Sequence, residues 1–503
     1  MQMTGFDSQK YLDEQTRCIR ERIGRFNKLY LEFGGKIIHD MHAARVLPGF
    51  DPNAKIKLLQ KLKDQTEIIV CIFAGDIERK KIRADFGITY DSDALKLIDD
   101  LREWDLNIRG VVLTRFQESQ SNAVAFRHKL ERRGMQVFIH RNINGYPGDV
   151  PLIVSEQGYG LNDYVPTTKP LVVVIAPGPN SGKLATCLSQ LYHDHKRGIQ
   201  VGYAKFETFP IWNIPLKHPV NIAYEAATAD IRDYNLIDPF HLDAYKEAAI
   251  NYNRDVDAFP LIKRILSRIM GKDLYKSPTD MGVNRAGFAI ADDAATRVAA
   301  TQEVIRRYFR YACEYAHGQV DSETVERVER LLEELDAKPE DRRVVIPARQ
   351  TAAAAQAAGK GDNGVFCGAA LELPDGRIIT GKNSPLLHAA SSLLLNAVKE
   401  LAEIPDKIHL LPPAITQSIG ALKQDVLNLK HTSLDVEEML IALSISAMTN
   451  PAAQLAMEKL KDLRNAELHL SHLPTSGDEA GLRRLGVHLT SDPLFPTKEL
   501  FMA

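Results

Sequence analysis

Cysteine, tryptophan and long apolar runs are all scarce in this sequence. Its 503 residues include five cysteines and two tryptophans. The cysteines are widely spaced and odd in number, and they form neither a CxxC pair nor a Cys/His pair at metal-ligand spacing; they are Cys18, Cys71, Cys187, Cys313 and Cys367. This pattern argues against a disulfide framework and predicts reduced, mostly buried thiols with no cysteine-based metal site.

Apolar runs are too short for a membrane anchor. No segment approaches the roughly 18 consecutive apolar residues that cross a membrane. Residues 1–17 also lack the apolar core and small-residue cleavage site of a secretory signal. We therefore expect a cytoplasmic protein without a membrane partner.

Neither sign of charge is in excess. Lysine and arginine total 63, aspartate and glutamate total 65, and the formal net charge is -2. Proteins that bind nucleic acids or anionic membranes usually carry a positive excess on one face. The balance therefore indicates small molecules or further copies of this chain as partners, so we expect a homo-oligomer and no nucleic-acid partner.

The length and the alternation of strands and helices predict a multi-domain α/β protein. A chain of 503 residues exceeds what one hydrophobic core usually supports. Amphipathic helices between β-rich runs predict crossover connections and a mostly parallel sheet in the N-terminal part. The expected strands are 29–33, 67–73, 108–113, 136–140, 171–176 and 200–205, and the expected helices among them include 92–104 and 121–133.

Changes in composition divide the chain into three expected domains. They are an α/β domain over 1–225, a mainly helical segment over 226–345, and a C-terminal α/β domain over 346–503. The Ala/Gly-rich stretch 351–364 is weakly patterned, which predicts a linker or an exposed loop near the second boundary.

The segment 211–293 is rich in Asn, Asp, Pro, His and aromatic residues. This composition is typical both of loops that line a ligand site and of irregular structure that caps a sheet. The candidates for lining a substrate site are His218, Glu225, Asp230, His241, Asp280 and Asn284. Structural hydrogen bonds are the competing interpretation for the histidines, and a helix cap or Asx turn explains Asp280 and Asn284 equally well. Residues 286–290 form a candidate strand.

A glycine-rich turn follows the expected strand at 171–176, and a helix follows the turn: LVVVIAPGPNSGKLATCLSQL. A strand, a glycine turn and a helix start in this order direct backbone N–H groups and the helix dipole at an anion. The candidate phosphate ligands are Gly178, Asn180, Ser181, Gly182, Lys183 and Thr186. The sequence therefore predicts a site for an anionic small molecule at 177–183.

This loop resembles the P-loop pattern GxxxxGK[ST], with two departures. Pro177 stands in place of the first glycine, and Leu184 replaces the hydroxyl residue that binds Mg²⁺. Thr186 carries the next hydroxyl, but it lies about 200° around the helix axis from Leu184. A conventional Mg²⁺–nucleotide geometry is therefore in doubt, and a simple turn that starts a helix is the alternative interpretation.

The following strand ends in GYAKFETFP, which places Lys205 and Glu207 at the carboxyl edge of the sheet, where ligands of open α/β sheets bind. Over 181–209 the chain resembles the start of the dethiobiotin-synthetase-like group of P-loop enzymes. In that group a lysine after the second strand helps to hold phosphates, and Lys205 is its nearest match, displaced by one position. The candidate catalytic residues are Lys183, Lys205 and Glu207, with Glu207 or Asp230 as a candidate Mg²⁺ ligand.

The C-terminal domain opens with a strand, a DG turn and a second strand, and then with His388 at the start of a helix. This order resembles the opening of the cytidine-deaminase fold, whose active members bind zinc through the histidine and a later PCxxC, with a catalytic glutamate two residues after the histidine. Here Ala390 occupies the glutamate position and no PCxxC follows. We therefore expect a deaminase-like sandwich without its zinc site.

Motifs along the whole chain resemble those of the bacterial family known as domain of unknown function 1846. They are, in order, LYLEFGGK, HAARVLPGF, APGPNSGKLATC, GYAKFETFP, HPVNIAYEAATAD, DPFHL, NYNRD and SPTDMGVN. The resemblance implies a multi-domain α/β cytosolic protein and names no reaction.

The leading functional hypothesis is an enzyme that binds a nucleotide or a phosphorylated metabolite at 177–183, as an ATP-dependent ligase or kinase acting on a small molecule would. Its cofactors would be ATP and Mg²⁺, with Lys183 and Lys205 stabilising phosphate charge. One alternative keeps the anion site for a phosphorylated substrate and discards ATP. The other is a non-catalytic, oligomeric binding or regulatory protein, which fits the missing Mg²⁺ hydroxyl.

Overall fold

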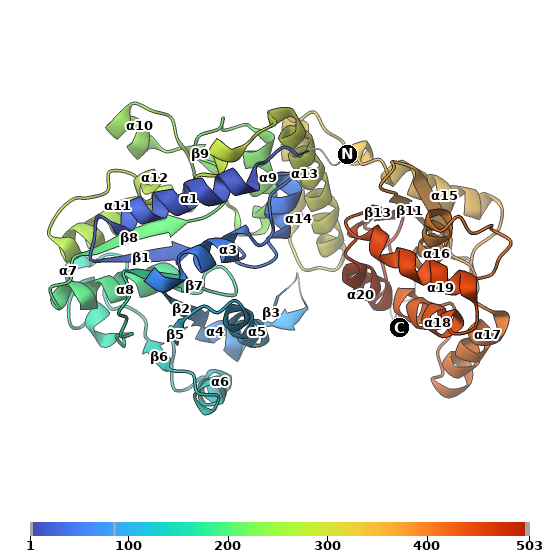
Figure 1. The fold of residues 1–503 in the computed structure, drawn as a ribbon, viewed down its shortest axis with the longest axis horizontal. Coiled ribbons are helices and arrows are strands. Elements are labelled where there is room, and N and C mark those ends of the chain that lie inside the picture. The colour runs from blue at the N-terminus through green and yellow to red at the C-terminus, as the bar shows by residue number, and fades with distance from the viewer. Residues whose placement is uncertain (1–3, 84–86, 498–503) are drawn as a thin grey trace. The chain divides into compact units, whose positions relative to one another are not determined.

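Six parallel strands form the central sheet in the computed structural model, which describes residues 4–83 and 87–497. The order across the sheet is β6-β5-β2-β7-β1-β8, and every pairing in it is parallel. The strands are β1 (Lys28–Phe33), β2 (Thr66–Phe73), β5 (Ile108–Thr114), β6 (Val137–His140), β7 (Leu171–Ile175) and β8 (Val201–Phe206). The predicted α/β class and its parallel N-terminal sheet are confirmed (Figure 1).

Helices cover both faces of this sheet, because crossovers between parallel strands leave no face open to solvent. One face, with Tyr30, Val172 and Tyr203, packs on α7, α8 and α11 in a single apolar cluster. The opposite face contacts α1, α4 and α5. The helices of this part are α1 (Ser8–Ile23), α2 (Met41–Val46), α3 (Ala54–Lys61), α4 (Ala74–Glu78), α5 (Tyr90–Glu103), α6 (Ser121–Arg132), α7 (Val150–Ile153), α8 (Lys183–Lys196), α9 (Pro219–Ala227), α10 (Pro239–Tyr245), α11 (Asn253–Met270) and α12 (Pro278–Met281).

The chain divides into two compact units, Met1–Ala300 and Thr301–Ala503. Residues 226–300 form no helical unit of their own. Phe259, Ile265 and Ile269 of α11 share the apolar cluster of the parallel sheet, so this part of the chain folds onto the N-terminal core. Two short hairpins are added to the N-terminal unit; they are β3 (Ile82–Arg83) with β4 (Ile88–Thr89), and β9 (Asn235–Ile237) with β10 (Ile250–Tyr252).

The C-terminal unit has its own four-stranded sheet, in the order β12-β11-β13-β14. Its strands are β11 (Gly368–Glu372), β12 (Ile378–Lys382), β13 (Glu467–Leu470) and β14 (His488–Ser491). Helix α13 (Asp293–Ala316) spans the boundary between the two units in the sequence. The remaining helices are α14 (Ser322–Glu334), α15 (Val345–Ala357), α16 (Ala389–Leu401), α17 (Pro413–Ala421), α18 (Val436–Ala447), α19 (Pro451–Lys459) and α20 (Ser476–Leu485).

Two local expectations are wrong. Much of the stretch 351–364 belongs to α15, because a run of alanines has the highest helix propensity and Ala348 and Ala355 are buried. Residues 286–290 begin with a 3₁₀ turn at Ala286–Ala289 instead of a strand. Across residues 4–83 and 87–497, no helix has both the length and the apolar content to cross a membrane.

A buried carboxylate ties α8 to the sheet. Asp194 accepts hydrogen bonds from the hydroxyls of Tyr30 (2.6 Å) and Tyr164 (2.7 Å), and its Oδ2 lies 2.8 Å from the Lys28 ammonium. The Lys28 ammonium also donates to the Thr167 carbonyl and hydroxyl, both at 3.0 Å. This network joins the last turns of α8 to the start of β1 and to the segment before β7.

We expect the substitution Asp194→Asn to lower the free energy of unfolding by about 3 kcal/mol, because it leaves the Lys28 ammonium buried without a counter-charge. Urea unfolding followed by circular dichroism measures the change. The matched control is Asp105→Asn, which removes the exposed partner of Lys63 and should leave stability nearly unchanged. Equal stability of Asp194→Asn and the parent protein would contradict the role given to this network.

Candidate functional site

The glycine-rich loop between β7 and α8 has a backbone conformation that only particular residues adopt. Gly182, the residue before α8, has φ = 88°, and Asn180 has φ = 56°. A Cβ atom at Gly182 would lie 2.9 Å from Thr114, and one at Gly178 would lie 2.4 Å from the Tyr90 ring. Glycine is therefore required at 182 for both conformation and space, and at 178 for space.

Two side chains at the end of β5 hold the carbonyl groups of this loop. The Thr114 hydroxyl donates to the Ser181 carbonyl at 2.7 Å, and the Arg115 guanidinium donates to the Asn180 carbonyl at 2.6 Å. Arg115 is itself held over the Phe73 ring, 3.5 Å from its centroid. These contacts leave the amide groups of the loop for another partner.

The loop amides have no acceptor within the described part of the chain. None of the N–H groups of Gly178, Asn180, Ser181, Gly182 and Lys183 donates a hydrogen bond there. The Ser181 hydroxyl is buried, and it too has no partner among the residues described. Free amides at the start of a 14-residue helix form the kind of site that binds an anion.

Thr186 is not part of this site, although it was a candidate phosphate ligand. Its hydroxyl lies 3.3 Å from the Cys71 sulfur and 3.4 Å from Nδ1 of His140, in the core between α8 and the sheet. Burial lowers the pKa of His140 to about 4, so this imidazole is neutral near pH 7. Thr186 faces the core and not the loop site because it lies about 200° around the helix axis from Leu184.

Lys205 lies at the end of β8 in a dense group of charges. Its ammonium is 2.7 Å from both carboxylate oxygens of Asp255, donates to the Tyr252 hydroxyl, and is 3.5 Å from Glu207. Burial alone would lower the pKa of Lys205, but Asp255, Glu207 and Glu32 raise it more, so the net shift is upward. Lys205 is therefore a permanent cation whose donors already have protein acceptors.

The pKa of Glu207 is raised above its ordinary value. Burial is the main cause, and the charges of Asp255 and Glu32 add to it, while Lys205 and Lys183 oppose it. Glu207 still exposes 28% of its side chain, and the backbone of Gly34 packs directly against it. A carboxyl group with these properties can hold a proton and exchange it with a ligand.

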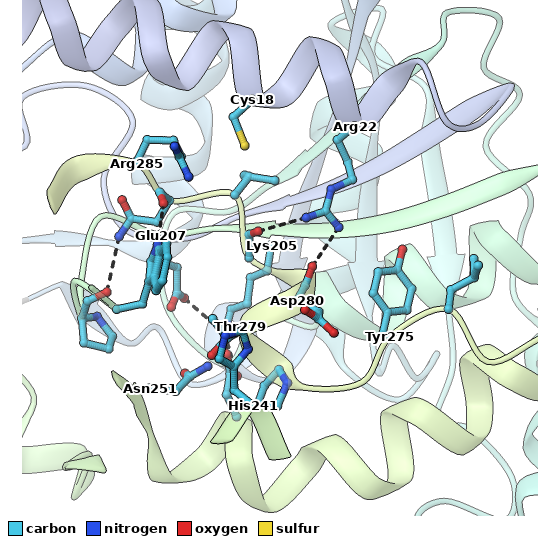
Figure 2. A pocket seen from close by; sticks show the side chains of 18 of the residues that line it. Cys18, Arg22, Lys205, Glu207, His241, Asn251, Tyr275, Thr279, Asp280 and Arg285 are labelled. Atoms are coloured by element: carbon cyan, nitrogen blue, oxygen red, sulfur yellow. Dashed lines mark hydrogen bonds and ion pairs between the residues drawn. The ribbon is translucent and has the colours of Figure 1, made fainter. Parts of the chain in front are cut away.

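A pocket with a cavity volume of about 430 Å³ lies along the outer edge of β8 (Figure 2). It brings together five of the residues chosen from the sequence, namely Lys205, Glu207, His241, Asp280 and Asn284. Residues 177–183 do not line it, and neither do His218, Glu225 and Asp230. The loop and the pocket are therefore two separate places, with β1 between β7 and β8.

Several candidate residues have a structural role. Asn284 donates to the carbonyls of Thr208 and Pro210 and accepts from the Ala286 amide, so both ends of its amide group are used. His218 caps α9 by accepting from the Val220 amide, and its other ring nitrogen lies 2.8 Å from Asp293.

His241 and Asp280 line the pocket and also have protein partners. Nδ1 of His241 lies 3.0 Å from the Ser277 hydroxyl. The Asp280 carboxylate accepts from the Tyr245 hydroxyl and from the Lys276 amide, each at 2.8 Å. Sequence reasoning missed Arg22, Trp212 and Arg285 as lining residues. The only sequence signals for them were the aromatic and polar texture of 211–293 and the amphipathic pattern of α1.

In the C-terminal unit, His388 is the residue before α16, and its Nδ1 lies 2.8 Å from Asp478. Burial lowers the pKa of His388, but the hydrogen bond and charge of Asp478 raise it more, so the net shift is upward. Asp478 also accepts from the Val436 amide and the Thr475 hydroxyl. This arrangement gives His388 a structural ion pair that joins α16, α18 and α20.

The raised pKa of Glu207 predicts a measurable pH dependence. Because the pKa of Glu207 is raised in the folded state, its protonated form contributes to the free energy of unfolding. The parent protein loses this contribution as the pH rises from the ordinary pKa of glutamate, about 4.3, through the raised pKa. Glu207→Gln lacks that loss, so its stability relative to the parent should increase from pH 4 to pH 8. Urea unfolding of both proteins across this range measures the difference.

The control for this experiment has the opposite sign. Lys196 and Tyr192 lower the pKa of Glu156, so Glu156→Gln should lose stability relative to the parent as the pH rises over the same range. Parallel curves for Glu207→Gln and the parent would show that Glu207 has no raised pKa.

Comparisons with known proteins place the chain in a family along its whole length. The model described as "Domain of unknown function DUF1846, N-terminal" matches residues 4–336, and the corresponding C-terminal model matches residues 340–501. A UPF0371 protein of Clostridium tetani (strain Massachusetts / E88) is 56% identical over 498 residues, with 99% of each chain covered. A UPF0371 protein of Clostridioides difficile (strain 630) is 55% identical over 499 residues, again with 99% of each covered. The chain therefore belongs to the bacterial family defined by the domain of unknown function DUF1846, as its sequence motifs indicate.

Proposed function

We propose that this protein is a phosphate-handling enzyme that binds the phosphate group of a nucleotide or a phosphorylated metabolite at residues 177–183. The observation that carries the proposal is the set of loop amides at the start of α8 that have no acceptor among the described residues. They lie next to Lys183 and to the Ser181 hydroxyl, which likewise has no partner there. Hydrogen bonds to a charged group are worth about 1.5–3 kcal/mol each. Several such hydrogen bonds together would favour the transfer of a phosphate group from water to this loop.

The proposal keeps ATP and Mg²⁺ as cofactors, but the loop itself supplies few ligands for Mg²⁺. Leu184 lacks a hydroxyl, and the Thr186 hydroxyl is used in the core, so Ser181 carries the one hydroxyl that residues 177–183 offer to Mg²⁺. Glu207 is the better carboxylate candidate, because the charge of Lys183 acts on it, whereas Asp230 is an exposed residue of a 3₁₀ turn. Mg²⁺ needs only one or two carboxylates when phosphates and water complete its shell.

A second candidate function is a non-catalytic binding or regulatory protein that acts as a cytoplasmic homo-oligomer. The engagement of Lys205 by Asp255, Tyr252 and Glu207 favours it, since these contacts leave Lys205 poorly placed to hold a second phosphate. Two resemblances are also part of the proposal. Residues 181–209 resemble dethiobiotin-synthetase-like enzymes, and the C-terminal unit resembles a deaminase sandwich without its zinc site.

The substitution Lys183→Ala tests the loop directly. We expect it to weaken the binding of ATP and pyrophosphate by at least about tenfold, because it removes one charge-assisted hydrogen bond, worth about 1.5–3 kcal/mol. Isothermal titration calorimetry with and without Mg²⁺ gives both affinities, and the two conditions separate a Mg²⁺–ATP site from a site for a phosphorylated metabolite.

The matched control is Lys129→Ala, which removes an exposed lysine from α6 and should leave both affinities unchanged. If Lys183→Ala binds both compounds as tightly as the parent, or if the parent binds neither, residues 177–183 are not a phosphate site.

A further inference from the structure

The pocket beside β8 has more positive than negative side chains. Its charged lining comprises the cations Arg22, Arg25, Lys205, Lys272 and Arg285 and the carboxylates Glu207, Asp255 and Asp280. Asp255 neutralises Lys205, and Glu207 adds a second carboxyl group beside it. The four remaining cations therefore outnumber the two remaining carboxyl groups, Glu207 and Asp280, and they come from α1, from the residues just after it, and from 272–285.

Apart from Lys205, the arginine and lysine residues of this lining have no close carboxylate partner among the residues described. Arg22 donates to two neutral groups, the carbonyls of Asp280 (2.8 Å) and Gly282 (3.3 Å). Within 4–83 and 87–497, no carboxylate lies at ion-pair distance from Arg22, Arg25 or Lys272. A positively charged pocket of this kind attracts an anionic ligand.

Arg285 has an unused donor. Its Nε is buried and has no hydrogen-bond partner among the described residues, and its nearest carboxylate, Glu14, is 3.8 Å from Nη2. The guanidinium lies 3.9 Å from the Phe288 ring centroid. Figure 2 shows Arg285 and Arg22 on either side of Cys18. An oxyanion between the two guanidiniums would accept hydrogen bonds from both, in the geometry that arginine favours.

Aromatic side chains form much of the remaining wall. They are Phe26, Phe209, Trp212, Tyr245, Tyr252 and Tyr275. The Trp212 indole is oriented by a hydrogen bond from Nε1 to the Asn284 carbonyl at 2.9 Å. An oriented indole offers a flat apolar face to a planar ring. The cavity volume of about 430 Å³ lies in the range of small-molecule sites.

We propose that this pocket binds a planar heteroaromatic ring that carries a phosphate monoester, as a nucleoside monophosphate does. The phosphate lies between Arg22 and Arg285, and the ring lies against Trp212. A phosphate monoester carries about 1.5 to 2 negative charges near pH 7, so it matches a lining with several cations better than one carboxylate does. Because residues 177–183 do not line the pocket, the inference stands whether or not the loop binds phosphate.

Trp212 makes this proposal testable in the full-length protein. The chain has two tryptophans, and Trp104, at the end of α5, is outside the pocket, so Trp104→Phe leaves Trp212 as the sole indole reporter. In this background we expect AMP and UMP to give a saturable change in fluorescence. Adenosine and inorganic phosphate, which each lack one half of the ligand, should bind at least about tenfold more weakly.

Arg285→Gln in the same background should weaken AMP binding by at least about tenfold, as should Arg22→Gln, which serves if the first variant does not fold. The exposed Arg133→Gln should stay within about twofold of the parent. The proposal is overturned if neither nucleotide gives a saturable change, if adenosine binds as tightly as AMP, or if both arginine variants bind AMP like the parent.

Discussion

The buried carboxylate of Asp194 is the constraint on which the candidate phosphate loop depends. Its two oxygens contact Lys28, Tyr30 and Tyr164, so the last turns of α8 are tied to β1 and to the segment that leads into β7. A helix held at this end presents its other end, with Lys183 and the free amides, at the carboxyl edge of β7. A buried ion pair is an expensive way to stabilise a fold, but it specifies the position of a helix well when all its hydrogen bonds are satisfied.

The parallel sheet then determines where chemistry can occur. All six strands end at one edge, and the loops that follow β5, β7, β1 and β8 meet there. Thr114 of β5 and Arg115, the residue after it, hold the carbonyls of the glycine loop, so a neighbouring strand shapes the proposed anion site in addition to the loop itself. The strand β1 separates that loop from the pocket beside β8, and it contributes Glu32, which accepts from the Tyr203 hydroxyl at 2.7 Å.

Electrostatics connects the two places even though no residue of 177–183 lines the pocket. The charge of Lys183 lowers the pKa of Glu207, which lines the pocket, while Asp255 and Glu32 raise it. An anion bound next to Lys183 would offset that positive charge and raise the pKa of Glu207 further. Occupancy of the proposed anion site would therefore favour the protonated form of Glu207.

Local patterns in the sequence determined the parallel sheet, its six strands, and the glycine loop with Lys183 at a helix start. They did so because buried strands, glycine turns and amphipathic helices each leave a short-range pattern. The same patterns placed Lys205 and Glu207 at the sheet edge. They did not reveal that α11 packs on the N-terminal core, that Thr186 faces Cys71, or that the alanine run of α15 is a helix rather than a linker.

Only the tertiary structure determined which residues line the pocket. Arg22 and Gly282 are 260 positions apart, yet the Arg22 guanidinium donates to the Gly282 carbonyl at the pocket wall. Arg285 and Trp212 enter the same cavity from segments without a regular period. Helix and strand periodicity reports which face of an element is buried, but it carries no information about which distant elements share a cavity. For that reason the loop was predictable from the sequence, and the partners of Lys205 and the cationic wall of the pocket were not.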